Sequence, residues 1–365
     1  MAQRLLISTS TVFKSALAIN YHAPIRTTWH ARLATPTQRL YSSRPQEKPS
    51  DTFKRPKVTI RTMRRMAKQK EPITMMTAQD YPSGLMVDRA GIDSCLVGDS
   101  LAMVALGLDS TNPITVDEML HHCRAVARGC KAPFLIGDLP FGSYESSPDD
   151  AVKVALRFVK EGNVEAVKLE GGKEMAETIR RITTVGVPVV AHVGLTPQRQ
   201  AALGGFKVQA KTAKQARALL EDAIAVQDAG AFAVVLEAVP EEIATYITEQ
   251  LEIPTIGIGA GKGCSGQVLV QNDALGVFDR FIPKFTKQYA KLGQMMVEGL
   301  REYHEEVKAG LFPTQQNTYP INEAELTRFF ESEEQRQSQN QSNQSSENHN
   351  ENLKAAPTAA VKASL

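Results

Sequence analysis

Residues 95–100 read CLVGDS, the pattern of a buried strand that ends in a carboxylate and a hydroxyl group. Gly98 allows the backbone to turn, and Asp99 and Ser100 are left where the strand stops. Four later runs end the same way: PFLIGDLP in Asp138, VEAVKLEGG in Lys168 and Glu170, VPVVAHVG in His192, and FAVVLEAVP in Glu237. In a parallel (β/α)8 TIM barrel the carboxyl ends of the strands converge on one mouth, where active sites are built. The repetition therefore predicts this α/β fold and a site made of these side chains.

The overall composition is that of a chain with a sizeable core and little net charge. Of its 365 residues, 42% are hydrophobic, and 42 Lys and Arg nearly balance 40 Asp and Glu. Such a chain has no strong field to attract nucleic acid, and its apolar runs are shorter than the roughly 20 residues of a membrane-spanning helix. The four cysteines form no CxxC pair, which suits a reducing compartment. We expect neither nucleic-acid nor membrane binding.

The two ends of the chain differ from its middle. Residues 1–46 contain six Lys and Arg and no Asp or Glu, which is typical of an organellar transit peptide, although a disordered basic tail would have a similar composition. The run RLYS resembles a mitochondrial cleavage site, so we expect processing near Tyr41 and a location in the mitochondrial matrix. Gln, Ser, Asn and Glu dominate residues 331–353, and we expect 316–365 to be mostly disordered. The catalytic barrel is then expected over 47–315.

Within the barrel region, strand-like and helix-like runs alternate. The expected strands cover residues 73–77, 95–100, 133–138, 164–170, 187–193, 232–237, 253–258 and, most faintly, 279–282. The expected helices cover 58–70, a run ending at 90, 115–129, 147–161, 212–229, a run from 240, and 286–309. The first of these helices is expected to close the bottom of the barrel. The glycine-rich run GIGAGKGCSG lacks the spacing of a P-loop or dinucleotide fingerprint, so we predict no nucleotide site there.

Lys168 and Glu170 carry the clearest geometric signal. Side chains on a strand alternate, so these two must face the same side, toward the barrel axis, while Val167 and Leu169 face the helices. Burying both charges is costly unless they are paired or bind a ligand. A simple ion pair is one explanation, but the Gly171–Gly172 turn that follows lets a ligand approach the backbone and favours a functional site.

Three carboxylates at the expected mouth, Asp99, Asp138 and Glu170, form an oxygen-rich set with Ser100 that suits Mg²⁺ better than Zn²⁺. Mg²⁺ often shares its shell with substrate oxygens, so a 2-oxo acid chelating through carboxylate and keto oxygens would fit, with Lys168 neutralising the carboxylate. A metal on the keto oxygen stabilises an enolate and makes removal of the neighbouring proton feasible.

Glu237 is the carboxylate that remains for a general base. It lies between the apolar residues Leu236 and Ala238, a setting that raises the pKa of a carboxylate toward a useful value. His192 has two interpretations of equal weight: a hydrogen-bonded core residue, or a side chain that contacts substrate or metal-bound water.

The chain resembles the ketopantoate hydroxymethyltransferase (3-methyl-2-oxobutanoate hydroxymethyltransferase) family over residues 58–313. The matching stretches are TAQDYPSG, LVGDSLAMVALG, DSTNPIT, GDLPFGSY, VKLEGG, AHVGLTPQ, GGFKVQAK, VLEAVP, IGIGAG and FIPKF. The resemblance implies a Mg²⁺-dependent barrel that transfers a one-carbon unit from 5,10-methylenetetrahydrofolate to 3-methyl-2-oxobutanoate. The product, 2-dehydropantoate, serves pantothenate and coenzyme A synthesis, and the family forms large homo-oligomers.

The resemblance also implies roles for individual residues. Asp99, Asp138 and Glu170 fall on the family's metal positions, the last commonly acting from farther out. Oxo-acid contacts fall on Asp99, Ser100, Asp138 and Lys168, and the proton acceptor falls on Glu237.

Two positions depart from the family pattern. Gln79 stands where the family usually has Tyr, and Ser265 stands where it usually has Asp. We expect both in loops at the mouth, where they would affect folate contact or loop closure rather than the chemistry.

Two other functions compete with this interpretation. A Mg²⁺-dependent 2-oxo acid carbon-carbon lyase of the isocitrate lyase kind uses the same barrel, but it depends on a cysteine in a KKCGH-type loop that this sequence lacks. A non-catalytic barrel that only binds a metabolite would not need Glu237 in addition to the metal set.

Overall fold

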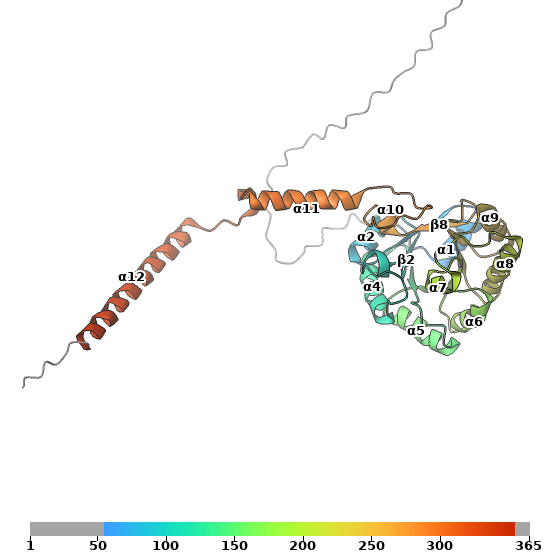
Figure 1. Ribbon diagram of the computed structural model, residues 1–365, viewed down its shortest axis with the longest axis horizontal. Coiled ribbons are helices and arrows are strands. Elements are labelled where there is room, and N and C mark those ends of the chain that lie inside the picture. The colour runs from blue at the N-terminus through green and yellow to red at the C-terminus, as the bar shows by residue number, and fades with distance from the viewer. Residues whose placement is uncertain (1–54, 355–365) are drawn as a thin grey trace, which may run out of the picture. The chain divides into compact units, whose positions relative to one another are not determined.

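The computed structural model describes residues 55–354, and its centre is a closed barrel of eight parallel strands (Figure 1). Each strand pairs with the next one in the chain, and β8 closes the ring by pairing with β1. The strands are β1 Ile73–Thr77, β2 Ser94–Val97, β3 Phe134–Asp138, β4 Ala166–Glu170, β5 Val189–Gly194, β6 Ala233–Glu237, β7 Thr255–Ile258 and β8 Gly266–Leu269. The predicted (β/α)8 barrel is confirmed.

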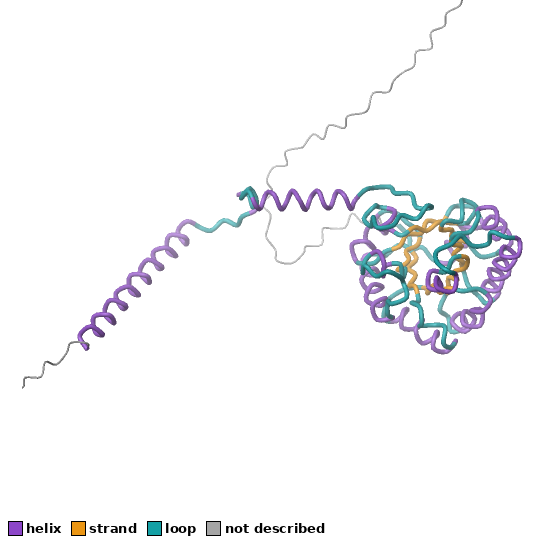
Figure 2. The backbone as a smooth tube through the Cα atoms, in the orientation of Figure 1, coloured by secondary structure: helices purple, strands orange, loops and turns teal. Residues whose placement is uncertain are grey.

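The longer helices surround the strands on the outside of the barrel (Figure 2). The helices up to the end of the barrel are α2 Tyr81–Arg89, α3 Leu101–Val104, α4 Val116–Gly129, α5 Pro148–Lys160, α6 Ala176–Thr184, α7 Gln200–Leu203, α8 Ala213–Asp228, α9 Glu241–Gln250 and α10 Gln271–Ala274, with short 3-10 turns at Lys173–Met175 and Pro197–Arg199. Thr115 and Ser147, where two of the expected helices start, cap α4 and α5 by accepting backbone N–H bonds from Glu118 and Asp150.

Helix α1, Ile60–Lys68, closes the amino-terminal end of the barrel. Thr59 begins it by accepting the N–H of Thr62. Its buried residues Met63 and Met66 belong to the same apolar cluster as Phe134, the first residue of β3. This confirms the expected closure of the bottom and leaves the carboxyl ends of the strands as the open mouth.

The pleat of β4 separates two apolar layers. Ala166 belongs to the cluster inside the barrel, whereas Val167 and Leu169 belong to the cluster between the strands and the outer helices. Since side chains alternate along a strand, Lys168 and Glu170 face the barrel interior with Ala166, as predicted.

The eighth strand does not lie where the sequence predicted it. Residues 279–282 are a loop, and β8 starts after the short connection 259–265, which contains no helix. A Cβ atom on Gly266 would lie 2.4 Å from the carbonyl oxygen of Ile73, so β8 can pair closely with β1 only because it starts with glycine. The prediction was wrong because this glycine was taken as part of a turn.

Two helices follow the barrel: α11, Leu292–Lys308, and α12, Glu323–Lys354, with the 3-10 turn Gln315–Asn317 between them. Helix α11 begins at Leu292 rather than at the predicted residue 286. The expectation that residues 316–365 are mostly disordered stays a prediction; the structure describes α12 within this range. None of the α12 side chains described, up to Asn343, is buried, and the apolar residues among them lie only in the first turns, where Phe329 and Phe330 are exposed.

Within residues 55–354, no helix is long and apolar enough to cross a membrane. All four cysteines lie in this range and are free thiols. The predicted transit peptide, 1–46, and the cleavage position near Tyr41 lie outside the described residues.

Candidate active site

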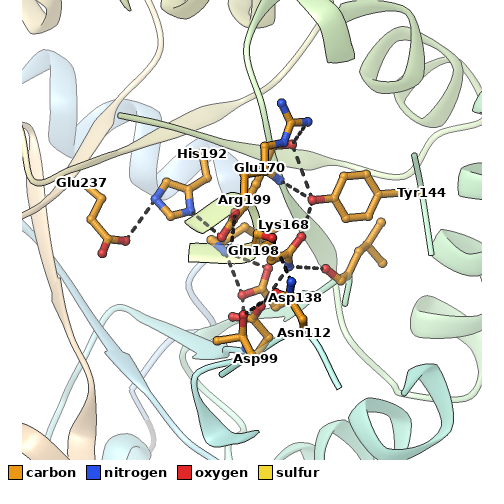
Figure 3. A network of polar contacts seen from close by, with 12 residues as sticks. Asp99, Asn112, Asp138, Tyr144, Lys168, Glu170, His192, Gln198, Arg199 and Glu237 are labelled. Carbon is orange, nitrogen blue, oxygen red and sulfur yellow. Dashed lines mark hydrogen bonds and ion pairs between the residues drawn. The ribbon is translucent and has the colours of Figure 1, made fainter. Parts of the chain in front are cut away.

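Asp138 and Lys168 form a buried ion pair at the carboxyl ends of β3 and β4 (Figure 3). The two residues are direct partners in the strand register, and the Lys168 Nζ donates to both Asp138 oxygens at 2.8 and 2.7 Å. Burial lowers the pKa of Lys168, but Asp138, Asp99 and Glu170 raise it more, so its net pKa lies above the usual range. The amine therefore carries a full positive charge among these carboxylates.

His192 lies between two carboxylates. It is the register partner of Glu170 in β4 and β5, with its Nδ1 3.4 Å from Glu170 Oε1 and its Nε2 3.1 Å from Glu237 Oε2. These contacts have ion-pair distances without hydrogen-bond geometry. Burial and the charge of Lys168 lower the pKa of His192, but the two carboxylates raise it more, to about 9. An imidazolium thus links Glu170 to Glu237 at neutral pH.

Asp99 joins this group from the turn after β2. Its backbone N–H donates to Asp138 Oδ2 at 3.2 Å, and its side chain is 5% exposed. Ser100 follows at the start of α3 and is half-buried. The strand ends therefore bring Asp99, Asp138 and Lys168 into direct contact, as their positions in the sequence predicted.

Two residues of this network have no role in the sequence predictions. Gln198, 1% exposed, follows β5 and donates its amide N–H to Asp99 Oδ2 at 2.9 Å. Tyr144, in the loop after β3, donates its hydroxyl to the Gln198 Oε1. Both lie in stretches that carry the family resemblance, AHVGLTPQ and GDLPFGSY, but no spacing or charge pattern singles them out.

The donor set fits Mg²⁺ by its chemistry without forming a closed cage. Within residues 55–354, no three His, Cys, Asp or Glu side chains form a group that could hold a metal ion alone. Mg²⁺ usually binds through one or two carboxylates and keeps several waters, so Asp99 and Asp138, already in contact, would suffice. Glu170 Oε1 is buried, makes no hydrogen bond within the described residues and lies 3.4 Å from His192 Nδ1, so Glu170 would act on the ion from farther out.

The two positions that depart from the family pattern lie at opposite ends of the barrel. Gln79 follows β1 at the mouth, where its Nε2 donates to Asn272 Oδ1 at 3.2 Å. Ser265 directly precedes β8 at the amino-terminal end and exchanges hydrogen bonds of 3.2 and 3.1 Å with Thr255. The expectation that Ser265 lies at the mouth was wrong, because it depended on the misplaced eighth strand.

Comparison with known proteins gives matches over the whole barrel. A family model described as Ketopantoate hydroxymethyltransferase matches residues 57–315. A protein of Emericella nidulans named 3-methyl-2-oxobutanoate hydroxymethyltransferase is 58% identical over 277 residues, covering 75% of this chain and 79% of its own. Proteins of the same name from Oleidesulfovibrio alaskensis and Clostridium novyi are 53% and 47% identical, covering 73% and 75% of this chain and 93% and 100% of their own.

Proposed function

This chain belongs to the ketopantoate hydroxymethyltransferase family, and we propose that it transfers a hydroxymethyl group from 5,10-methylenetetrahydrofolate to 3-methyl-2-oxobutanoate. The product would be 2-dehydropantoate, and the family implies a place in pantothenate biosynthesis. The observation that carries the proposal is the Glu237–His192 pair at the same mouth as the Asp138–Lys168 pair. The family matches favour this reaction over a lyase of the isocitrate lyase kind and over a non-catalytic barrel.

The oxo acid would bind at the Asp138–Lys168 pair. Lys168 is the buried cation at the centre of the site and would attract the substrate carboxylate. Asp99 and Asp138 would hold Mg²⁺, with Glu170 acting from farther out, and Ser100 lies beside Asp99. When bound, Mg²⁺ would supply positive charge toward the keto oxygen of the oxo acid.

Glu237 would take the proton from C3 of the oxo acid. Its side chain is 13% exposed, so the carboxylate is screened from bulk water but not sealed off from a substrate. His192 holds it from one side at 3.1 Å, which fixes the direction of the carboxylate. Water would break both bonds between the one-carbon unit and the folate nitrogens, supplying the oxygen of the resulting formaldehyde unit and the two protons that return to those nitrogens. The carbon nucleophile would then add to the formaldehyde carbon, and the alkoxide formed would take up the proton removed from C3.

A coupled assay tests the proposal. The purified protein is incubated with 5,10-methylenetetrahydrofolate and 3-methyl-2-oxobutanoate, and the formation of 2-dehydropantoate and tetrahydrofolate is followed with Mg²⁺ and with EDTA. We expect equal amounts of both products with Mg²⁺ and loss of turnover with EDTA. Cleavage of the oxo acid without folate consumption would instead support a lyase, and binding without turnover would support a non-catalytic barrel.

We also propose that the enzyme is a homo-oligomer located in the mitochondrial matrix. Helix α11 has no buried residue, yet it carries large apolar side chains that are more than half exposed, including Met295, Leu300 and Tyr303. Large exposed apolar surfaces of this kind commonly mark protein contacts. Sedimentation velocity would test the assembly, and imaging of the tagged full chain would test the location.

A further inference from the structure

Gln198 occupies a buried position between the carboxylates proposed to bind the metal (Figure 3). Its Nε2 donates two hydrogen bonds of 2.9 Å, one to Asp99 Oδ2 and one to the carbonyl oxygen of Leu139. Its backbone N–H donates to Glu170 Oε2 at 3.0 Å. Gln198, a single residue in the segment that follows β5, thus contacts two carboxylates that come from the ends of β2 and β4.

Tyr144 fixes the orientation of the Gln198 amide. The Tyr144 oxygen accepts the backbone N–H of Glu170 at 3.2 Å, and its hydroxyl donates to the Gln198 Oε1. The two acceptors on the other side, Asp99 Oδ2 and the Leu139 carbonyl, require the Nε2. A flipped amide would place its oxygen against these two acceptors, so a single orientation is compatible with all the neighbours.

We propose that Gln198, held by Tyr144, is a positioning residue that directs the oxygens of Asp99 and Glu170 toward a divalent cation. The inference rests on the proposed function only in taking these carboxylates as the metal set. By bonding to Asp99 Oδ2 and Glu170 Oε2, Gln198 fixes the rotation of both carboxylates. Asp99 Oδ1 stays outside these bonds, and Glu170 Oε1 lies 3.4 Å from His192 Nδ1. Partners that orient metal ligands typically change metal affinity about 10- to 100-fold when removed.

Two substitutions separate the amide from the rest of the residue. Gln198→Met keeps the volume and the backbone N–H bond to Glu170 but removes both amide atoms. Tyr144→Phe removes the hydroxyl that bonds to the amide and that also accepts the backbone N–H of Glu170. Gln271→Met is the matched control, because Gln271 is also a buried glutamine whose Nε2 donates to a backbone carbonyl, that of Ser83 at 3.3 Å.

The measurement is the affinity of the full chain for Mn²⁺, followed by electron paramagnetic resonance of the free ion and by calorimetry, with thermal melting to check folding. We expect Gln198→Met to weaken Mn²⁺ binding about 10- to 100-fold, Tyr144→Phe about threefold to tenfold, and Gln271→Met not at all. If Gln198→Met does not fold, the Mn²⁺ affinity of Tyr144→Phe decides the outcome.

The outcomes distinguish this inference from the proposed function. Wild-type Mn²⁺ affinity in folded Gln198→Met and Tyr144→Phe, or no Mn²⁺ binding by the unmodified protein, would overturn the positioning role, whatever the transfer assay shows. An equal loss of affinity in Gln271→Met would also overturn it, because the effect would then be general to buried glutamines. If the Mn²⁺ affinities are as predicted but the protein transfers no hydroxymethyl group, the positioning role of Gln198 is supported and the proposed reaction is refuted.

Discussion

Glu237→Gln isolates the base from the rest of the reaction. The change removes the charge 3.1 Å from His192 Nε2 but keeps the size and an oxygen that can accept a hydrogen bond. Proton removal from C3 needs only the oxo acid, the metal and the base, so it can be observed without folate. In D₂O the unmodified protein should exchange the C3 proton of 3-methyl-2-oxobutanoate, and proton NMR would follow the loss of signal.

The expected size of the effect follows from the role assigned to Glu237. A general base contributes roughly 10²- to 10⁴-fold to a rate, which corresponds to about 3–5 kcal/mol of activation free energy. The fold should tolerate the change, because His192 keeps Glu170 as a second carboxylate at 3.4 Å. We therefore expect a melting temperature close to that of the unmodified protein together with exchange slowed by at least two orders of magnitude.

The control and the refuting result are both specific. Glu242→Gln removes a charge from an exposed position at the start of α9 and should exchange at the normal rate. Affinity for the oxo acid, measured by calorimetry, shows whether slow exchange reflects lost binding. If Glu237→Gln exchanges as fast as the unmodified protein with its affinity intact, Glu237 is not the base.

Three further changes test other parts of the molecule. Asp138→Asn should weaken Mg²⁺ and oxo-acid binding together while keeping the fold, because both would share one shell; unchanged Mg²⁺ dependence of turnover would remove Asp138 from the site. His192→Asn should lower the melting temperature most below pH 6.5 and least above pH 9. Folding raises the pKa of His192 from 6.5 to about 9, and the stabilisation that this provides is lost as the pH rises through that value. A decrease in melting temperature that is constant across this range would contradict the ion pairs. The mature protein should begin near Ser42, which mass spectrometry of protein from mitochondria would show, and deletion of residues 331–365 should leave melting temperature and activity nearly unchanged.

The repeated strand ends in the sequence were sufficient to predict the barrel and the side of it that carries the polar residues. Alternation along β4 correctly placed Lys168 and Glu170 on the inner face. Their partners could not be predicted, because these depend on the register between strands: Lys168 lies opposite Asp138, and Glu170 lies opposite His192. The simple Lys168–Glu170 ion pair considered from the sequence is replaced by two contacts between strands.

Gln198 could not be predicted for a different reason. Its importance comes from contacts with residues 59 and 99 positions away in the chain, Leu139 and Asp99. A neutral glutamine in a loop gives no charge, periodicity or spacing signal. Only the closure of the barrel brings these segments together, so such residues become visible when the structure is known.

The placement of the buried charges indicates that the mouth is built for chemistry rather than for stability. Asp138, Lys168 and His192 are each at most 5% exposed, and removing such groups from water costs several kcal/mol per ion before their mutual attraction is counted. Deeper in the barrel, the inward positions of the same strands carry Ile136 and Val190, which fill the interior without that cost. Apolar side chains could fill the level of Asp138, Lys168 and His192 in the same way. The charged residues stand instead at the strand ends, where a ligand can reach them and where their attraction for its charges offsets the cost of burial.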